Sequence, residues 1–187
     1  DLVDDLTGTR LGRAKSATFR TADVVGLDVL AHVIKTMQDG LKNDPFHATY
    51  AIPPVLERLV KKGALGQKAG AGFYRKEGKQ IQVLDSQQDT YTASGAQADA
   101  IITRILKRPS AERFALLRST DHPQAQFLWA IFRDVFHYIA VHLGEIADNA
   151  RDLDFALRWG FGWERGPFEE WQAAGWMQIA EWIQEDI

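Results

Sequence analysis

The feature that most constrains this chain is a run of apolar residues after Pro123. They recur every three or four positions, the spacing of one face of an α-helix. The face comprises Phe127, Leu128, Ile131, Phe132, Val135, Phe136, Ile139, Leu143 and Ile146. Charged residues such as Arg133 and Asp134 interrupt the run and argue against a membrane span. We predict a helix over 125–148 whose aromatic face is buried against other helices or a second subunit.

Shorter helical patterns surround this long helix. "ADAIITRILKR" and "SAERFALLRS" are separated by Pro109, which ends the first helix and leaves Ser110 to cap the second. "DLDFALRW" and "MQIAEWIQE" predict the last helices. The second half of the chain is therefore expected to be helical throughout.

The first half also begins with helices. Apolar residues at helical spacing follow Asp28, a suitable N-cap, and Gly40 is a suitable stop. A preceding helical turn over 17–25 should break near Gly26. "IPPVLERLVKKG" has prolines at its start and a glycine, Gly63, just beyond its end, which predicts one more short helix.

The pattern changes to strand periodicity after Gly72. "GFYRKEGKQIQVLD" alternates on either side of Glu77-Gly78 and predicts a β-hairpin with Phe73, Ile81 and Val83 facing inward. The polar stretch 85–97 that follows is expected to be a linker between two halves.

The composition excludes several classes of function. The chain has 187 residues and a formal charge of −3. It has no cysteine, and this absence rules out thiol catalysis and thiolate metal sites and fits a cytoplasmic protein. It has no basic stripe, so nucleic acid is not an expected partner. Because it starts at Asp1 without a methionine, we expect a piece of a longer polypeptide.

Two segments 149 positions apart share a pattern. "FRTADVVGLDVLAHVI" (19–34) and "FEEWQAAGWMQIAEWI" (168–183) align Phe19 with Phe168 and place Asp23 opposite Gln172. This frame favours an internal duplication. Chance similarity between two amphipathic helices is the alternative.

Three motifs in order carry a resemblance to a known family: "RTADVVGLD" (20–28), "LVKKGALGQKAGAGFY" (59–74) and "RWGFGWERGPFEEWQAAG" (158–175). The chain resembles the C-terminal region of bacterial 3-hydroxyacyl-CoA dehydrogenases, in particular the multifunctional form that also has an enoyl-CoA hydratase module. The resemblance implies an all-α fold, a duplicated helical C-terminal domain of the 6-phosphogluconate dehydrogenase C-terminal-like type, with one small β-hairpin near 72–84. It implies an N-terminally truncated first repeat over 1–84, a linker over 85–97 and a second repeat over 98–187.

The resemblance also implies a function in fatty-acid β-oxidation. In this family a preceding Rossmann domain binds NAD and oxidises the 3-hydroxyl of the acyl-CoA, while the helical region completes the substrate cleft and supports domain or dimer contacts. The chain alone is therefore expected to be inactive, to have no catalytic residue and to bind no NAD itself. An asparagine that contacts substrate in the family has no counterpart here. Ala17-Thr18 replaces a Gly-Pro pair, and Gln172 occupies a position that is usually acidic.

The glycine-rich segment "GFGWERG" (160–166) could be taken for a phosphate loop. It does not fit G-x-G-x-x-G and it follows a predicted helix instead of a strand. We interpret it as a corner between two helices, with Trp159, Trp163 and Trp171 filling space around the bend.

A second glycine-rich loop, "GALGQKAGAGF" (63–73), has Lys61, Lys62 and Lys68 nearby. The glycines are expected to serve the turn into the hairpin, and a lysine is by default solvated. Lys68 is nevertheless the candidate for substrate binding, because an ammonium can pair with a phosphate of coenzyme A.

No metal site is predicted from the histidines. His137 and His142 are five positions apart and do not share a helix face, and H-E-x-x-H is absent. Two alternative functions stay open: a helical interaction module without acyl-CoA contact, and an independent acyl-CoA-binding module without catalysis.

Overall fold

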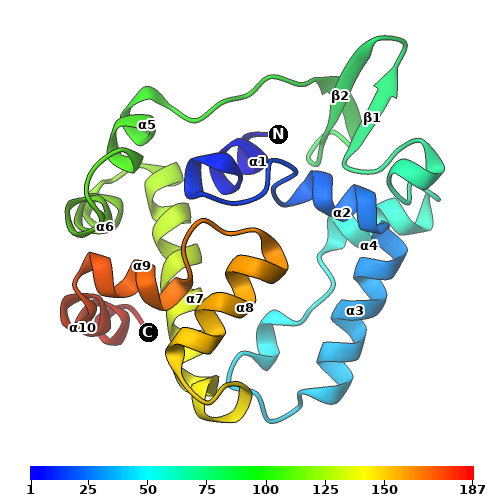
Figure 1. Ribbon diagram of the computed structural model, residues 1–187. Coiled ribbons are helices and arrows are strands. Elements are labelled where there is room, and N and C mark those ends of the chain that lie inside the picture. The colour runs from blue at the N-terminus through cyan, green and yellow to red at the C-terminus, as the bar shows by residue number, and fades with distance from the viewer. The chain divides into compact units, whose positions relative to one another are not determined.

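The computed structural model describes residues 1–187 and divides into two structural units. The N-terminal unit comprises Asp1–Asp4 and Ser16–Ala96, and the C-terminal unit comprises Asp5–Lys15 and Gln97–Ile187. Most of the chain is helical, as predicted (Figure 1). The α-helices are α1 (Leu2–Thr7), α2 (Phe19–Val25), α3 (Leu27–Gly40), α4 (Pro54–Lys61), α5 (Ala100–Leu106), α6 (Ser110–Ser119), α7 (Pro123–Ile146), α8 (Ala150–Phe161), α9 (Pro167–Ala174) and α10 (Trp176–Asp186). Three short 3-10 helices are η1 (Thr9–Leu11), η2 (His47–Thr49) and η3 (Gln67–Ala69).

The N-terminal unit packs α2, α3 and α4 around a small apolar core. Leu27, Leu56 and Leu59 are almost completely buried there, and the rings of Phe19 and Phe73 lie 4.4 Å apart. The helix expected to be capped by Asp28 instead begins at Leu27, and Gly26 occupies the N-cap position with φ 106°. The predicted break at Gly26 is confirmed, but Asp28 lies in the first turn.

The predicted hairpin is part of a three-stranded antiparallel sheet. Strand β1 (Tyr74–Glu77) pairs with β2 (Gln80–Asp85), which pairs in turn with β3 (Thr90–Ala93). The polar stretch 85–97, expected to be a linker, contains this third strand. Threonines are common in strands, but the sequence pattern pairs β2 with β1 alone and does not indicate a second partner for it. Phe73 is buried as predicted, whereas Ile81 is 45% exposed, so its predicted inward orientation is wrong.

In the C-terminal unit, α7 is the central helix, with α8 and α9 beside it (Figure 1). Its apolar face is buried within the same unit: Phe132 and Phe136 pack on Phe114 of α6 with ring centroids 4.9 and 5.7 Å apart. Burial of part of this face against other helices is therefore confirmed, while Ile146 at its end is 59% exposed. Contact of the face with a second subunit stays a prediction. Leu128, Leu117 and Ile179 complete this core.

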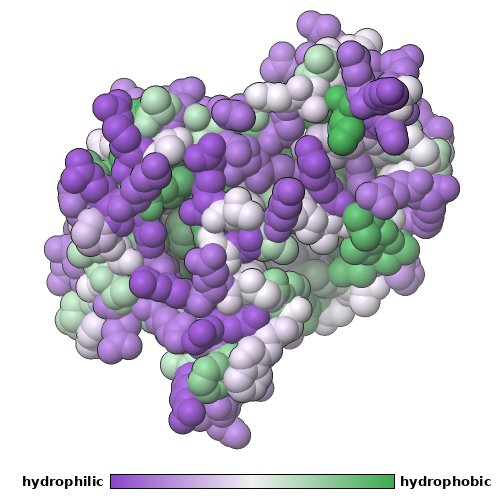
Figure 2. All heavy atoms as spheres, turned by 45° about the horizontal axis from the view of Figure 1, so that its top comes forward, coloured by the Kyte–Doolittle hydropathy of each residue, from purple (hydrophilic) through white to green (hydrophobic).

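The face shown in Figure 2 is mostly hydrophilic, with hydrophobic residues gathered in small patches. The exposed hydrophobic side chains of the N-terminal unit include Val25, Val29 and Val33, which are 52%, 43% and 47% exposed and recur every four residues along α2 and α3. None of the helices combines the length and the hydrophobicity that a membrane crossing requires.

Candidate functional site

Asp23 organises the glycine-rich loop that leads into the sheet. Its carboxylate accepts hydrogen bonds from the backbone N–H groups of Phe73 and Tyr74, each at 2.8 Å. The side chain is only 4% exposed. Burial raises the pKa of this carboxyl, and the two N–H donors counteract that rise because they stabilise the charged form. One buried side chain thus joins the motifs at 20–28 and 59–74.

Gly72 allows this close approach. A Cβ atom at Gly72 would lie 2.1 Å from Oδ1 of Asp23, far inside van der Waals contact. Any other residue would displace either the loop or the carboxylate, so the glycine is a packing requirement and does not by itself indicate a phosphate loop.

A pocket of about 350 Å³ lies beside this anchor in the N-terminal unit. Arg20, Arg75 and Lys76 line it together with Asp23 and Tyr74, so positive charge predominates. The guanidinium of Arg20 lies 4.8 Å from the centre of the Tyr74 ring. This arrangement suits the binding of an anion.

The Tyr74 hydroxyl belongs to the structural support of this pocket. It donates a hydrogen bond to Oδ2 of Asp4 at 2.8 Å. Burial, followed by the interaction with Asp4, raises the pKa of the Tyr74 hydroxyl well above its ordinary value. The phenol is therefore held in its protonated form, as the donor to Asp4.

Lys68, the predicted substrate-binding residue, lies outside the lining of this pocket and pairs with a carboxylate. Its Nζ donates to both carboxylate oxygens of Asp28, at 2.6 and 2.7 Å. The hydrogen bond from Lys68 lowers the pKa of the Asp28 carboxyl. The lysine side chain is 48% exposed and remains accessible to solvent.

The other two lysines of this region are also paired. Lys61 lies 2.9 Å from Glu57, one turn earlier in α4, and Lys62 pairs with Asp89. Sequence reasoning missed the cations that line the pocket, Arg20 and Lys76, because their convergence depends on the path of the loop around Asp23.

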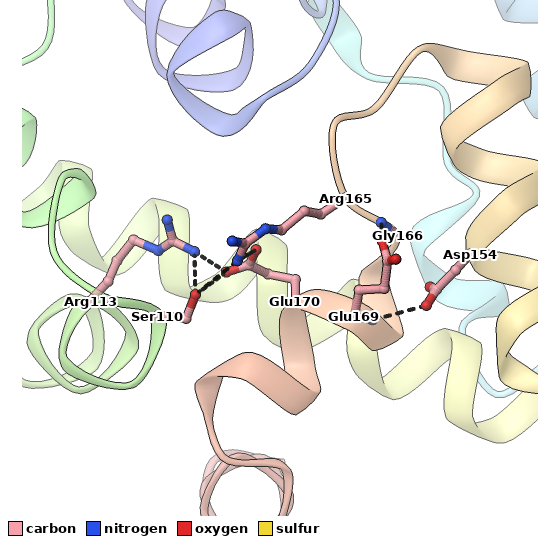
Figure 3. Close-up of polar contacts among 7 residues, drawn as sticks. All are labelled: Ser110, Arg113, Asp154, Arg165, Gly166, Glu169 and Glu170. Atoms are coloured by element: carbon pink, nitrogen blue, oxygen red, sulfur yellow. Dashed lines mark hydrogen bonds and ion pairs between the residues drawn. The ribbon is translucent and has the colours of Figure 1, made fainter.

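The segment 160–166 is a corner between α8 and α9, as predicted. Asp154 of α8 is 5% exposed and accepts hydrogen bonds from the first N–H groups of α9, those of Phe168 at 2.8 Å and Glu169 at 2.9 Å (Figure 3). Glu169 in turn accepts from the N–H of Gly166 at 2.7 Å. Side chains therefore satisfy the free N–H groups at the start of α9.

The three tryptophans of this segment differ in their environments. Trp171 stacks on Phe136, with ring centroids 5.5 Å apart, and Trp163 lies under the guanidinium of Arg13. Trp159 is 78% exposed and stacks on Phe155 along the surface of α8, so the prediction that it fills the bend is wrong. Trp159 follows Phe155 by four residues, so the two rings lie side by side on the helix. The number of tryptophans in the segment does not show that this side of α8 faces solvent.

Neither glycine-rich loop has the geometry of a dinucleotide site. The loop at 63–73 leads from α4 into an antiparallel strand, and the one at 160–166 joins two helices. A Rossmann phosphate loop instead connects a parallel strand to a helix. Neither loop therefore fits the diphosphate of NAD in the manner of a Rossmann phosphate loop. No three side chains of His, Cys, Asp or Glu come close enough together to hold a metal ion.

Comparison with known proteins relates this chain to a family. Residues 2–76 match the family model described as 3-hydroxyacyl-CoA dehydrogenase, C-terminal domain. The chain carries the C-terminal domain of the 3-hydroxyacyl-CoA dehydrogenase family. A protein of Bacillus subtilis (strain 168) named "Probable 3-hydroxyacyl-CoA dehydrogenase" is 43% identical over 185 residues, which cover 98% of this chain and 23% of the relative.

Two further relatives have related names. A Rickettsia felis protein, named as the trifunctional enzyme of a fatty acid oxidation complex, is 27% identical over 89% of this chain and 22% of its own length. A 3-hydroxybutyryl-CoA dehydrogenase of Mycobacterium tuberculosis (strain H37Rv) is 44% identical over 29% of this chain and 18% of its own. The chain thus spans about a quarter or less of the length of these relatives. No solved structure matches it.

Proposed function

We propose that this 3-hydroxyacyl-CoA dehydrogenase C-terminal domain forms a wall of the substrate cleft in an NAD-dependent enzyme of fatty-acid β-oxidation. The observation that carries the proposal is the match of residues 2–76 to the family's C-terminal domain, together with the basic pocket beside Asp23 in the same residues. The enzyme oxidises the 3-hydroxyl of an acyl-CoA to a ketone.

The chemical step belongs to a Rossmann domain outside this chain. NAD would supply the hydride acceptor there, and no residue of this chain is assigned a part in that transfer. The role of this chain is to bind and orient the acyl-CoA and to exclude water from the cleft. An additional enoyl-CoA hydratase module is part of the same proposal and is supported by the trifunctional enzyme among the relatives. A cytoplasmic location is also part of it, because a chain without cysteine fits a reducing compartment.

Lys68 remains the proposed contact for a phosphate of coenzyme A. Its ammonium is half-exposed and sits with Asp28 at the start of α3. A phosphate would have to compete with the Asp28 carboxylate, so we expect a modest contribution from this lysine. Arg20 and Lys76 in the neighbouring pocket are further candidates for the same anion.

The exposed valines of the N-terminal unit are the proposed contact with a second subunit or with the rest of the enzyme. Val29 and Val33 lie one turn apart on α3, Val25 lies at the end of α2 before the break at Gly26, and each of the three is at least 43% exposed. They are proposed in addition to the face of α7, part of which is buried in the core of the C-terminal unit. Burial of exposed apolar side chains is favourable because it removes apolar surface from water.

We also propose that residues 1–84 and 98–187 are two copies of one helical repeat, joined through 85–97. The support is that a buried aspartate receives the first N–H groups of the following helix in both: Asp4 those of α2, and Asp154 those of α9.

The test is NADH-dependent reduction of acetoacetyl-CoA by the full-length enzyme, with the 187-residue chain assayed beside it. We expect activity in the full-length enzyme alone. In that enzyme, Lys68→Gln should raise KM about threefold to tenfold without changing kcat, because a single exposed ion pair contributes about 1 kcal/mol. Lys42→Gln, at an exposed lysine of the same unit, is the matched control.

Each other outcome identifies an alternative. Turnover by the chain alone would contradict the assignment of the chemistry to another domain. If the full-length enzyme is inactive and the chain binds acyl-CoA, the chain is an acyl-CoA-binding module. If neither acts nor binds, a helical interaction module is the better description.

A further inference from the structure

A second pocket lies entirely within the C-terminal unit, and the proposed function does not use it. It encloses about 330 Å³, and its walls come from the η1 loop, the α5–α6 turn, α7 and the α8–α9 corner. The N–H of Glu164 donates to the carbonyl of Gly12 at 2.8 Å and ties two of these walls together. Five of the lining residues are arginines: Arg10, Arg13, Arg108, Arg113 and Arg165.

The negative charge in this pocket is limited. Glu164 and Glu170 are the two acidic residues among the lining side chains, against the five arginines. Arg10 and Arg108 pair with carboxylates outside the lining, Asp5 at 2.9 Å and Glu112 at 3.6 Å. Both side chains of the second pair are at least half exposed, so solvent screens that interaction strongly.

Arg13 has the clearest unused capacity to bind an anion. Its guanidinium lies flat over Trp163, 4.2 Å from the ring centre, and 5.8 Å from that of Phe132. Stacking uses the face of the guanidinium and leaves its in-plane N–H donors unoccupied. The guanidinium makes no hydrogen bond or ion pair with the protein, and burial lowers its pKa, which an anionic ligand would reverse.

Arg113 and Arg165 share one carboxylate. Both guanidiniums point at Glu170, with the hydroxyl of Ser110 between them (Figure 3). The Arg165 contact is long, at 3.5 Å, and Nε of Arg113 is buried without a hydrogen-bond partner. A buried N–H without an acceptor is unfavourable, so this wall has donors that an additional acceptor would satisfy.

We propose that this pocket binds a small molecule that carries a diphosphate. Guanidinium groups bind phosphate oxygens through paired N–H donors, and two adjacent phosphates supply enough acceptors to reach Arg13 on one wall and Arg113 and Arg165 on another. The Trp163 ring holds Arg13 in place for this contact. In this site arginine side chains would bind the phosphates. It therefore differs from a phosphate loop, in which backbone N–H groups of a glycine-rich segment do so and which the sequence of 160–166 does not fit.

The test is isothermal titration calorimetry of the 187-residue chain with inorganic pyrophosphate, ADP and coenzyme A. We expect saturable binding of pyrophosphate that weakens as KCl rises. Arg13→Gln and Arg165→Gln should each weaken it about tenfold or more, the loss of one charge-assisted contact. Arg165 has a 58% exposed side chain, so its replacement should leave the fold intact. Arg151→Gln, which removes an arginine outside this pocket, should change the affinity less than twofold.

Glu170→Gln gives a readout that a purely structural role would not produce. It removes a negative charge from the pocket and releases Arg113 and Arg165, so pyrophosphate should bind several-fold more tightly. Tighter binding of ADP or coenzyme A than of pyrophosphate would identify which organic group the site accepts. No saturable binding up to 5 mM, equal losses in Arg165→Gln and Arg151→Gln, or unchanged affinity in Glu170→Gln would each overturn the proposal.

Discussion

The corner before α2 and the corner before α9 are built in the same way, and two of the sequence differences between them are informative. In the first, Asp4 accepts from the N–H groups of Thr18, Phe19 and Arg20 at 3.0, 2.6 and 3.0 Å. In the second, Asp154 accepts from the N–H groups of Phe168 and Glu169, the counterparts of Phe19 and Arg20. A buried aspartate that satisfies free N–H groups at a helix start is thus common to both corners.

The first difference is at the position two residues before the matched phenylalanines, Phe19 and Phe168. Ala17 stands in the first corner where Gly166 stands in the second. Gly166 has an extended backbone, and a Cβ there would lie 2.3 Å from Asp154. Ala17 instead has a left-handed backbone with φ 50°. An alanine is thus accommodated in the first corner only with an unfavourable backbone conformation.

The second difference concerns Asp23 and Gln172. Asp23 is buried because the loop at 66–74 folds back onto it, whereas Gln172 is exposed. Gln172 instead lies on the exposed side of α9, between the corner and α10. The comparison teaches that the acidic residue serves the loop and is not required by the helical corner itself.

Gly166→Ala should have the largest effect on this comparison. The added Cβ would overlap Asp154, so we expect the free energy of unfolding to fall by about 3 kcal/mol. Chemical denaturation monitored by circular dichroism measures it. Gly144→Ala is the control, because no atom lies within 4 Å of a Cβ at that helical position, and it should stabilise by about 0.5–1 kcal/mol. Equal effects of both variants would contradict the close packing at the second corner.

Asp23→Ala and Gln172→Ala test the second difference. Removing the carboxylate leaves two N–H groups in the buried loop without acceptors, which should lower the free energy of unfolding by about 2–3 kcal/mol. At the equivalent exposed position, Gln172→Ala should stay within about 0.5 kcal/mol of wild type. Denaturation of both variants, with amide exchange at Phe73 and Tyr74 as a local readout, decides the matter. A loss at Gln172 as large as that at Asp23 would show that the corner itself needs the polar group.

Ala17→Gly should have the smallest effect and the opposite sign. Glycine adopts positive φ without strain, so the variant should be more stable by about 0.5–1 kcal/mol after its larger conformational entropy in the unfolded chain is counted. Ala14→Gly, at an exposed alanine with ordinary φ in the same connection, should destabilise instead. A destabilised Ala17→Gly would mean that the left-handed conformation is not a source of strain.

Much of the fold follows from local sequence patterns. The long helix, observed over Pro123–Ile146, the break at Gly26 and the helix stop near Gly63 were predictable, because periodicity, glycine and proline act within a few residues. The hairpin turn was predicted one residue too early, at Glu77-Gly78: Glu77 still pairs with Gln80, so the turn is Gly78-Lys79. The third strand and the exposure of Ile81 were not predictable, since each depends on which strand and which core lie opposite.

The candidate sites followed the same division. Lys68 was identified from its neighbours in the sequence, but its partner Asp28 lies 40 residues away. The arginines of the C-terminal pocket come from segments as distant as Arg13 and Arg165 and carry no local pattern. The sequence by itself determined most of the helices and the family resemblance, because those depend on short-range preferences and on motifs. Only the tertiary structure decided which charges converge, because burial and pairing depend on residues that are distant in the chain.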